Sequence, residues 1–197
     1  FKSILLIIMN KLLDCIINKK SSQIPIWFMR QAGRYLPEFQ KIRKENLDFI
    51  KLCLNSNLVT DITIQPLNRF DLDAAIIFSD ILIIPYGLGQ KVEFKKGKGP
   101  ILEECDPKKI LAAEETDVIK KFKPIYQAIN QVKNKTKKNV IGFTGAPWTL
   151  LLYMLNKESP KNNFNFNLIT KNKLLVNQLL EKLVNIIIFH IAKQIEA

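Results

Sequence analysis

Short apolar segments that are typical of β-strands alternate along this chain with longer segments that are typical of helices. The strand-like segments are residues 25–29 (PIWFM), 74–78 (AAIIF) and 139–144 (NVIGFT). The AAIIF run is apolar at every position, which predicts a strand that is buried on both faces. Because strands separated by helices form parallel sheets, the sequence predicts an α/β fold built on a parallel sheet.

Helices are predicted between and after these strands, in residues 37–54, 56–70, 114–131, 147–155 and 168–195. Ser56 is a typical N-cap residue, so it is predicted to start the second of these helices. Pro66 is predicted to kink or end the same helix, because proline donates no backbone hydrogen bond.

The N-terminal segment is apolar but too short to span a bilayer. An amphipathic helix is predicted there from four apolar residues, Leu12, Leu13, Ile16 and Ile17. Because the chain opens on Phe1, Met9 is the expected start of the protein, and residues 1–8 are expected to be an upstream extension.

The composition is that of a folded protein. The chain has 197 residues, 47% of them hydrophobic, which is enough for one domain with a buried core and excludes a disordered tail. Cys15, Cys53 and Cys105 lie far apart in the sequence, and the chain has one histidine. The sequence therefore indicates neither a disulfide framework nor a zinc site, and it fits a reducing cytoplasm.

The chain is basic, with 30 Lys and Arg against 18 Asp and Glu, a formal net charge of +12. Lysine accounts for 26 of the 30, in runs such as residues 133–138. Such runs are typical of solvated faces. A basic module that binds nucleic acid or acidic membranes is the remote alternative, and the lack of interleaved arginine and aromatic residues disfavours it.

Two arginines flank a glycine directly after the first predicted strand, in the sequence Arg30-Gln-Ala-Gly33-Arg34. All four arginines of the chain fall between residues 30 and 69. Because guanidinium is a planar two-point donor, this placement favours a carboxylate-binding motif. The alternative is an ordinary pair of surface salt bridges.

Polar residues also follow the second and third predicted strands. Ser79 and Asp80 come directly after AAIIF, where parallel α/β proteins bind ligands. The alternative is a helix N-cap at either residue. Tyr153 lies on the helix after the third strand, and for it the alternative is an aromatic core residue.

Three stretches closely resemble the uroporphyrinogen decarboxylase family: residues 24–43 (IPIWFMRQAGRYLPEFQKIR), 65–84 (QPLNRFDLDAAIIFSDILII) and 142–154 (GFTGAPWTLLLYM). The intervening GLGQKVEF and GKGP also match, so the resemblance runs with few gaps from residue 25 to about residue 154. It implies a (β/α)8 TIM barrel, of which residues 1–197 hold about the first three βα units as one incomplete domain. It also implies a cytoplasmic homodimer.

The activity implied by the resemblance is decarboxylation of the four acetate side chains of uroporphyrinogen III to methyl groups. The product is coproporphyrinogen III, in haem and tetrapyrrole biosynthesis. Arg30 and Arg34 match arginines that face the acetate and propionate carboxylates. Asp80 matches an aspartate that binds the pyrrole N–H groups and stabilises developing positive charge. The implied substrate-binding residues are Arg30, Gln31, Ala32, Gly33, Arg34, Asp80 and Tyr153, and the implied catalytic residues are Asp80 and Arg30.

No cofactor and no metal are expected for this chemistry. A protonated pyrrole is itself an electron sink for decarboxylation, so pyridoxal, thiamine or a metal ion is not required. The expected partners are the substrate and, at full length, a second copy of the protein, with neither nucleic acid nor membrane.

The chain departs from the family at two functional positions. A serine in an aspartate-serine-tryptophan stretch and a histidine near the C-terminus are both missing, and His190 lies in a helix-like segment with no such motif. His190 is therefore expected to be a packed or half-exposed helix residue. A complete barrel takes roughly 250 residues. The alternative function is thus an inactive fragment of the enzyme, from a truncated or split gene.

Overall fold

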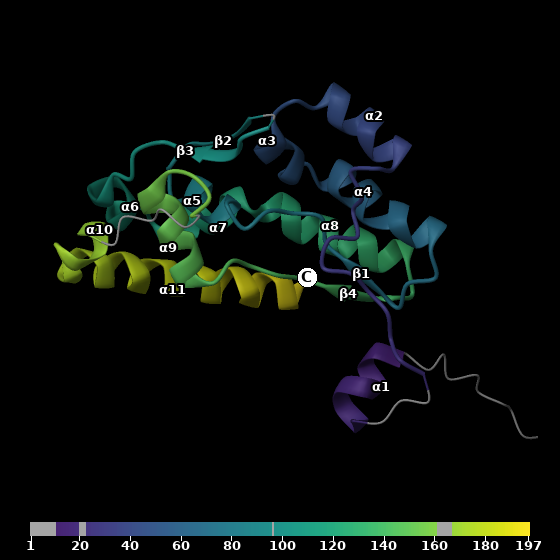
Figure 1. Ribbon diagram of the computed structural model, residues 1–197. Helices are drawn as coiled ribbons and strands as arrows, with labels where there is room; N and C mark the ends of the chain where they lie inside the picture. Colours follow the sequence, from purple (N-terminus) through teal and green to yellow (C-terminus); the bar gives the residue numbers. More distant parts are fainter. Residues whose placement is uncertain (1–10, 20–22, 96, 161–166) are drawn as a thin grey trace, which may run out of the picture.

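The computed structural model describes residues 11–19, 23–95, 97–160 and 167–197 (Figure 1). The predicted upstream extension and Met9 lie outside these residues. The helices are α1 (Lys11–Asn18), α2 (Pro37–Glu45), α3 (Phe49–Cys53), α4 (Ser56–Arg69), α5 (Ile83–Gly87), α6 (Pro107–Ala112), α7 (Glu115–Lys121), α8 (Lys123–Lys135), α9 (Pro147–Asn156), α10 (Asn167–Thr170) and α11 (Lys173–Glu196). The strands are β1 (Ala74–Ile76), β2 (Val92–Lys95), β3 (Gly99–Leu102) and β4 (Asn139–Ile141).

The predicted parallel sheet is confirmed by the pairing of β1 with β4. The two strands are parallel, with Ala74 opposite Asn139 and Ile76 opposite Ile141. All three residues of β1 are buried, as its continuous apolarity predicts. Helix α4 precedes β1 and packs on α8, which precedes β4, so each strand is reached through a helix.

The β2–β3 hairpin, which lies between β1 and β4 in the sequence, was not predicted. Strands β2 and β3 pair antiparallel, and Gly97 in the connection and Gly99 at the start of β3 have φ angles of 80° and 86°. Glycine adopts these values without the steric cost that a side chain would bring. The Lys-rich KVEFKKGKGPIL sequence lacks a run of alternating apolar residues, so no strand pattern marks it.

The predicted buried strand at residues 25–29 is wrong. The segment forms no strand, and two hydrogen bonds join it to the residue before β1. Asp73 N–H donates to Ile26 O, and Ile26 N–H donates to Asp73 Oδ2, both at 2.8 Å. Its apolar side chains are exposed, Met29 to 74%. A parallel strand is buried only where neighbouring elements cover it, and the described residues supply too few.

Two of the predicted long helices are each divided in two. Residues 46–48 separate α2 from α3, because Asp48 accepts a hydrogen bond from Lys51 N–H and begins a new helix. Residue 122 separates α7 from α8, where Pro124 removes a donor from the backbone ladder. The predicted cap of α4 shifts by one residue, to Asn55, and Pro66 lies inside the helix.

Helix α11 runs along the outside of the other helices and ends beside β4 (Figure 1). It is long and apolar enough to cross a membrane by length and composition alone, and 33% of that window is buried inside the protein. Its buried residues include Leu179, Leu183 and Ile186, which belong to the main core. The helix thus serves as a core helix on one face and leaves another face uncovered.

Candidate functional site

Gln31 anchors the arginine motif to the sheet. Its side chain is buried, accepts a hydrogen bond from Phe28 N–H at 2.9 Å and donates one to Ala74 O at 3.1 Å. The second bond joins the turn to the first residue of β1. Gln31 therefore fixes the backbone between Arg30 and Arg34, because its side-chain oxygen and nitrogen each make a hydrogen bond inside the protein.

The four arginines divide into two pairs. Arg69 makes a two-point contact with Glu38, at 2.7 and 2.8 Å. Arg43 donates to the carbonyl oxygens of Asn46 and Leu47 after α2. Both arginines thus serve the fold.

Arg30 and Arg34 behave differently from the other two. Both side chains are exposed, and neither guanidinium makes a hydrogen bond or ion pair with the residues that the structure describes. Two permanently charged planar donors are therefore available to an external carboxylate.

Asp80 lies four residues after the end of β1 and is half-buried. Its Oδ1 accepts a hydrogen bond from Leu82 N–H at 2.8 Å. Burial raises the pKa of Asp80, and the Leu82 hydrogen bond and the positive charges of Arg30 and Arg34 oppose that rise. The positive charges of the two arginines thus act on this carboxylate, and the carboxylate also holds the turn before α5.

Thr63 holds the end of β1 in place, and sequence reasoning missed it. Its hydroxyl accepts a hydrogen bond from Phe78 N–H at 2.9 Å and donates one to Val59 O at 2.7 Å. Phe78 lies two residues before Asp80, so the hydroxyl fixes the backbone that carries the carboxylate. A threonine inside a helix gives no sequence signal for this function.

Two hydroxyl groups near the strand ends are buried and have no partner among the described residues: Ser79 Oγ, after β1, and Thr144 Oγ1, after β4. The alternative of an N-cap at Ser79 is thus not supported, because its hydroxyl bonds no described backbone group. Leaving such a group unpaired costs about 1–3 kcal/mol. These atoms are therefore unused hydrogen-bonding groups at the same end of both parallel strands.

Tyr153 is half-buried on α9 and packs against the main core. Its hydroxyl lies 3.3 Å from Ser159 Oγ. Within the described part of the chain, no hydrogen bond joins it to Arg30, Arg34 or Asp80. Its packing fits an aromatic core residue, and its role in binding stays a prediction.

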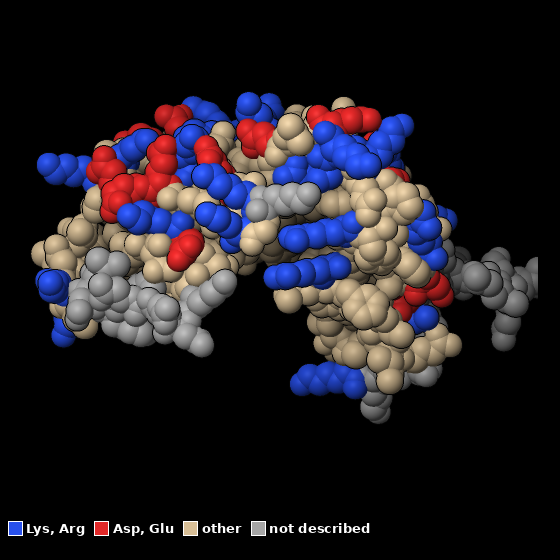
Figure 2. All heavy atoms as spheres, turned by 45° about the horizontal axis from the view of Figure 1, so that its top comes forward, with Lys and Arg blue, Asp and Glu red and all other residues tan. Residues whose placement is uncertain are grey.

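A pocket of about 580 Å³ adjoins the arginine motif. Its walls are mainly apolar and include Arg30, Gln31 and Tyr35. On the face seen in Figure 2, a hollow lies at the centre, with Lys and Arg side chains reaching into it. Among the residues described, no group of three or more His, Cys, Asp or Glu could hold a metal ion.

His190 is a packed helix residue, as expected. It is buried on α11, and its Nδ1 lies 2.9 Å from the hydroxyl of Tyr126 on α8. The ring also contacts Phe122 edge-on, with 5.2 Å between centroids. Burial lowers the pKa of His190 from 6.5 to about 4. The residue therefore joins α8 to α11 and lies outside the candidate site.

We expect the contact of α8 with α11 to weaken in acid. The unfolded chain takes up a proton at His190 below about pH 6.5, whereas the folded chain resists until about pH 4. The free energy of unfolding is therefore unaffected above pH 7 and falls between pH 6.5 and 4, by about 3 kcal/mol in all. Because the chain has one histidine, its single imidazole NMR signal reports this pKa directly. A midpoint near 6.5 would contradict the packing.

A sequence model of the uroporphyrinogen decarboxylase (URO-D) family matches residues 9–197. The chain belongs to the uroporphyrinogen decarboxylase family. Relatives named uroporphyrinogen decarboxylase include one from Rickettsia canadensis (strain McKiel), 41% identical over 90% of this chain and 53% of the relative. Another, from Aliarcobacter butzleri (strain RM4018), is 38% identical over 93% of this chain and 55% of the relative. The chain thus spans about half the length of these relatives.

The fold comparison agrees with a partial TIM barrel. A methyltransferase from Methanosarcina mazei superposes with a TM-score of 0.71 over 94% of this chain and 55% of that structure, at 13% sequence identity. At this identity the match concerns the fold alone. The expected fold class is confirmed, because the match covers 55% of that structure and the parallel pair β1–β4 with its helices fits part of an α/β barrel.

Proposed function

We propose that this chain supplies the N-terminal part of an enzyme that decarboxylates the four acetate side chains of uroporphyrinogen III, giving coproporphyrinogen III. The observation that carries the proposal is that two exposed arginines with no internal partner among the described residues, Arg30 and Arg34, lie near enough to the half-buried Asp80 for their charges to oppose the rise of its pKa. A substrate with several carboxylates around an electron-rich ring needs both kinds of group.

Arg30 and Arg34 bind the acetate and propionate carboxylates in this proposal. Guanidinium forms two parallel hydrogen bonds with a carboxylate, which fixes the orientation of the substrate. The backbone of residues 31–33 lies between the two arginines. A side chain at position 33 would collide with the Tyr35 ring, and glycine avoids this collision. Any contact of Gln31 with substrate comes from its backbone, because its side chain is bonded internally.

Asp80 binds the pyrrole N–H groups through its carboxylate. Protonation of a pyrrole carbon makes the ring cationic, so the electron pair of the breaking bond to carbon dioxide flows into the ring. The exocyclic carbon then takes up a proton to become the methyl group, and the proton first added to the ring carbon is released, so one proton in all replaces the carbon dioxide. A fixed negative charge in a site of restricted water access stabilises the cation more than it would in bulk solvent. Tyr153 supplies a further substrate contact in this proposal.

The proposed enzyme is a cytoplasmic homodimer. It uses no cofactor or metal ion, and it binds neither nucleic acid nor a membrane.

The alternative is that these residues alone form an inactive fragment. Two observations favour it: among the described residues the parallel sheet has two strands, β1 and β4, and the pocket beside Arg30 is lined by neither Asp80 nor Tyr153. Both proposals are tested in a chimaera that joins this chain to the C-terminal half of the Rickettsia canadensis relative. Turnover of uroporphyrinogen III by the chimaera supports the enzyme, and its failure favours the fragment.

Arg30→Lys in this chimaera should impair substrate binding although the charge is kept. An ammonium loses the planar two-point contact, at an expected cost of about 1–3 kcal/mol. Steady-state kinetics should show a KM raised by about 5- to 150-fold. Arg69→Lys is the matched control, because its pair with Glu38 is internal to the fold. Unaltered kinetics for Arg30→Lys would remove the reason for singling out this arginine.

A further inference from the structure

Helix α4 supplies a hydrogen-bond partner for the backbone just after strand β1. Ile77 N–H donates to Ile141 O at 3.0 Å, so it points toward β4. Because these directions alternate along a strand, Phe78 N–H points to the other side, and there it donates to the Thr63 hydroxyl at 2.9 Å. The hydroxyl in turn donates to Val59 O at 2.7 Å. Thr63 thus accepts the bond that a carbonyl oxygen of a neighbouring strand would accept.

The side chain of Phe78 is held as well. Its ring meets Phe39 of α2 and Phe49 of α3 edge-on, with 5.8 Å between centroids in each contact. Edge-on contacts of this kind are favourable for aromatic rings. Thr63 itself is 2% exposed, so its hydroxyl is shielded from water. The backbone and the side chain of residue 78 are therefore both fixed.

Asp80 lies between this fixed residue and a second point of attachment. One residue separates it from Phe78, and on its other side Asp80 Oδ1 accepts a hydrogen bond from Leu82 N–H at 2.8 Å. The charges of Arg30 and Arg34 also act on the carboxylate, and such interactions depend on the distance between the charges. A shift of the backbone at residue 78 would therefore change the position and the electrostatic surroundings of the carboxylate.

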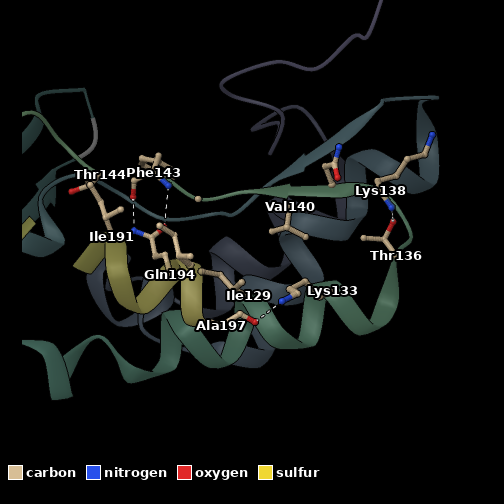
Figure 3. Close-up of a pocket in the computed structure, with 13 residues that line it drawn as sticks. Ile129, Lys133, Thr136, Lys138, Val140, Phe143, Thr144, Ile191, Gln194 and Ala197 are labelled. Carbon is tan, nitrogen blue, oxygen red and sulfur yellow. Dashed lines mark hydrogen bonds between the residues drawn. The ribbon is translucent and has the colours of Figure 1, made fainter. Parts of the chain in front are cut away.

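The end of strand β4 is held in the same manner. Phe143 N–H donates to Gln194 Oε1 at 3.0 Å, and Gln194 Nε2 donates to Phe143 O at 3.1 Å, beside a pocket of about 600 Å³ (Figure 3). After both strands, a polar side chain of a helix thus bonds the backbone. Thr63 is the partner on the strand that leads to Asp80.

We propose that Thr63 is a positioning residue for Asp80. Its hydroxyl fixes the backbone at residue 78, so that the carboxylate meets the pyrrole N–H groups and the developing cation at the right distance. Preorganised charge stabilises a transition state where it is aimed at the developing charge, and a misplacement of about 1 Å can lower the rate by about 10²-fold. This inference rests on the proposed function.

Thr60 offers a matched control on the same helix. It is fully buried, and its hydroxyl lies 2.7 Å from both Ser56 O and Gln131 Oε1, so its partners belong to α4 and α8. Both threonines are buried, and each hydroxyl has two partners, so their loss should lower the melting temperature by similar amounts. A difference in activity between the two variants is therefore not an effect of stability.

The test compares Thr63→Val, Thr63→Ser and Thr60→Val in the chimaera with a complete barrel. Valine has nearly the shape of threonine but no hydroxyl, whereas serine keeps the hydroxyl. We expect Thr63→Val to lower kcat for uroporphyrinogen III at least about fivefold. KM should change little, because in the proposed function Arg30 and Arg34 bind the carboxylates. Thr63→Ser and Thr60→Val should keep kcat close to that of the parent.

Backbone hydrogen exchange gives a second readout that needs no substrate. Loss of the acceptor for Phe78 N–H should speed exchange at residues 78–82 in Thr63→Val and leave it unchanged in Thr60→Val. Thr63→Ala is a second variant that removes the hydroxyl, and it does so without adding a methyl group. Circular dichroism checks that each variant is folded.

The proposal is wrong if Thr63→Val loses no more activity than Thr60→Val, or if Thr63→Ser fails to keep kcat. Unchanged exchange at residues 78–82 in both variants that lack the Thr63 hydroxyl would also overturn it. A parent chimaera without turnover would instead contradict the proposed decarboxylation. The exchange measurement then still decides whether Thr63 holds the segment that carries Asp80.

Discussion

Asp80→Asn, in the chimaera with a complete barrel, should lower the rate of uroporphyrinogen III decarboxylation by about 10²–10³-fold. This is the loss expected when one preorganised electrostatic group is removed from a reacting centre. The structure makes the substitution selective: asparagine keeps the Oδ1 acceptor for Leu82 N–H and removes the charge. The measurement is single-turnover decarboxylation by the parent and the variant.

Asp80→Glu is the companion variant, since it keeps the charge at a displaced position and should retain part of the activity. The pH dependence gives a second readout. Because burial raises the pKa of Asp80, the parent should lose activity on the acid side at a higher pH than an ordinary aspartate would. That acid limb should be absent from Asp80→Asn. If asparagine works as well as aspartate, residue 80 serves only the turn before α5.

The 197-residue chain by itself should show no turnover of uroporphyrinogen III. Two parallel strands cannot close a barrel, and both the edge of β4 and the apolar segment around Met29 are exposed. We expect the molar mass measured by light scattering to increase with the concentration of the chain. We also expect the chain to bind a hydrophobic dye. A monomer that unfolds cooperatively and turns over substrate would contradict this expectation.

The elements that sequence predicts well are those with a local cause. Strand β1 follows from AAIIF, and α9 begins at Pro147, a favoured first helical residue. The segment at residues 25–29 has a similar apolar run, but its burial depends on neighbours that are remote in sequence. The β2–β3 hairpin depends on glycines at positive φ, and a Lys-rich sequence does not indicate which glycines adopt it.

The candidate site divides in the same way. Arg30 and Asp80 could be singled out from the sequence because each follows a strand-like run, and their roles in binding and catalysis stay predictions. The sequence could not predict that Arg43 and Arg69 bond within the fold while Arg30 and Arg34 stay available. That difference depends on where Glu38 and the end of α2 lie in space. Thr63 was missed because its hydroxyl serves a residue fifteen positions away.

The dependence of Asp80 on the charges of Arg30 and Arg34 has a thermodynamic consequence. In the proposed function, pairing of substrate carboxylates with these guanidinium groups would lower the positive potential at Asp80 and raise its proton affinity above that of the free protein. Binding is then linked to partial proton uptake at the carboxylate. The pyrrole N–H groups oppose that uptake by donating to the charged form. Substrate carboxylates would thus offset the positive potential of the arginines, which favours protonation of Asp80, whereas the pyrrole N–H groups favour its ionised form. The balance of these two effects on the pKa of Asp80 would set the lowest pH at which the site works.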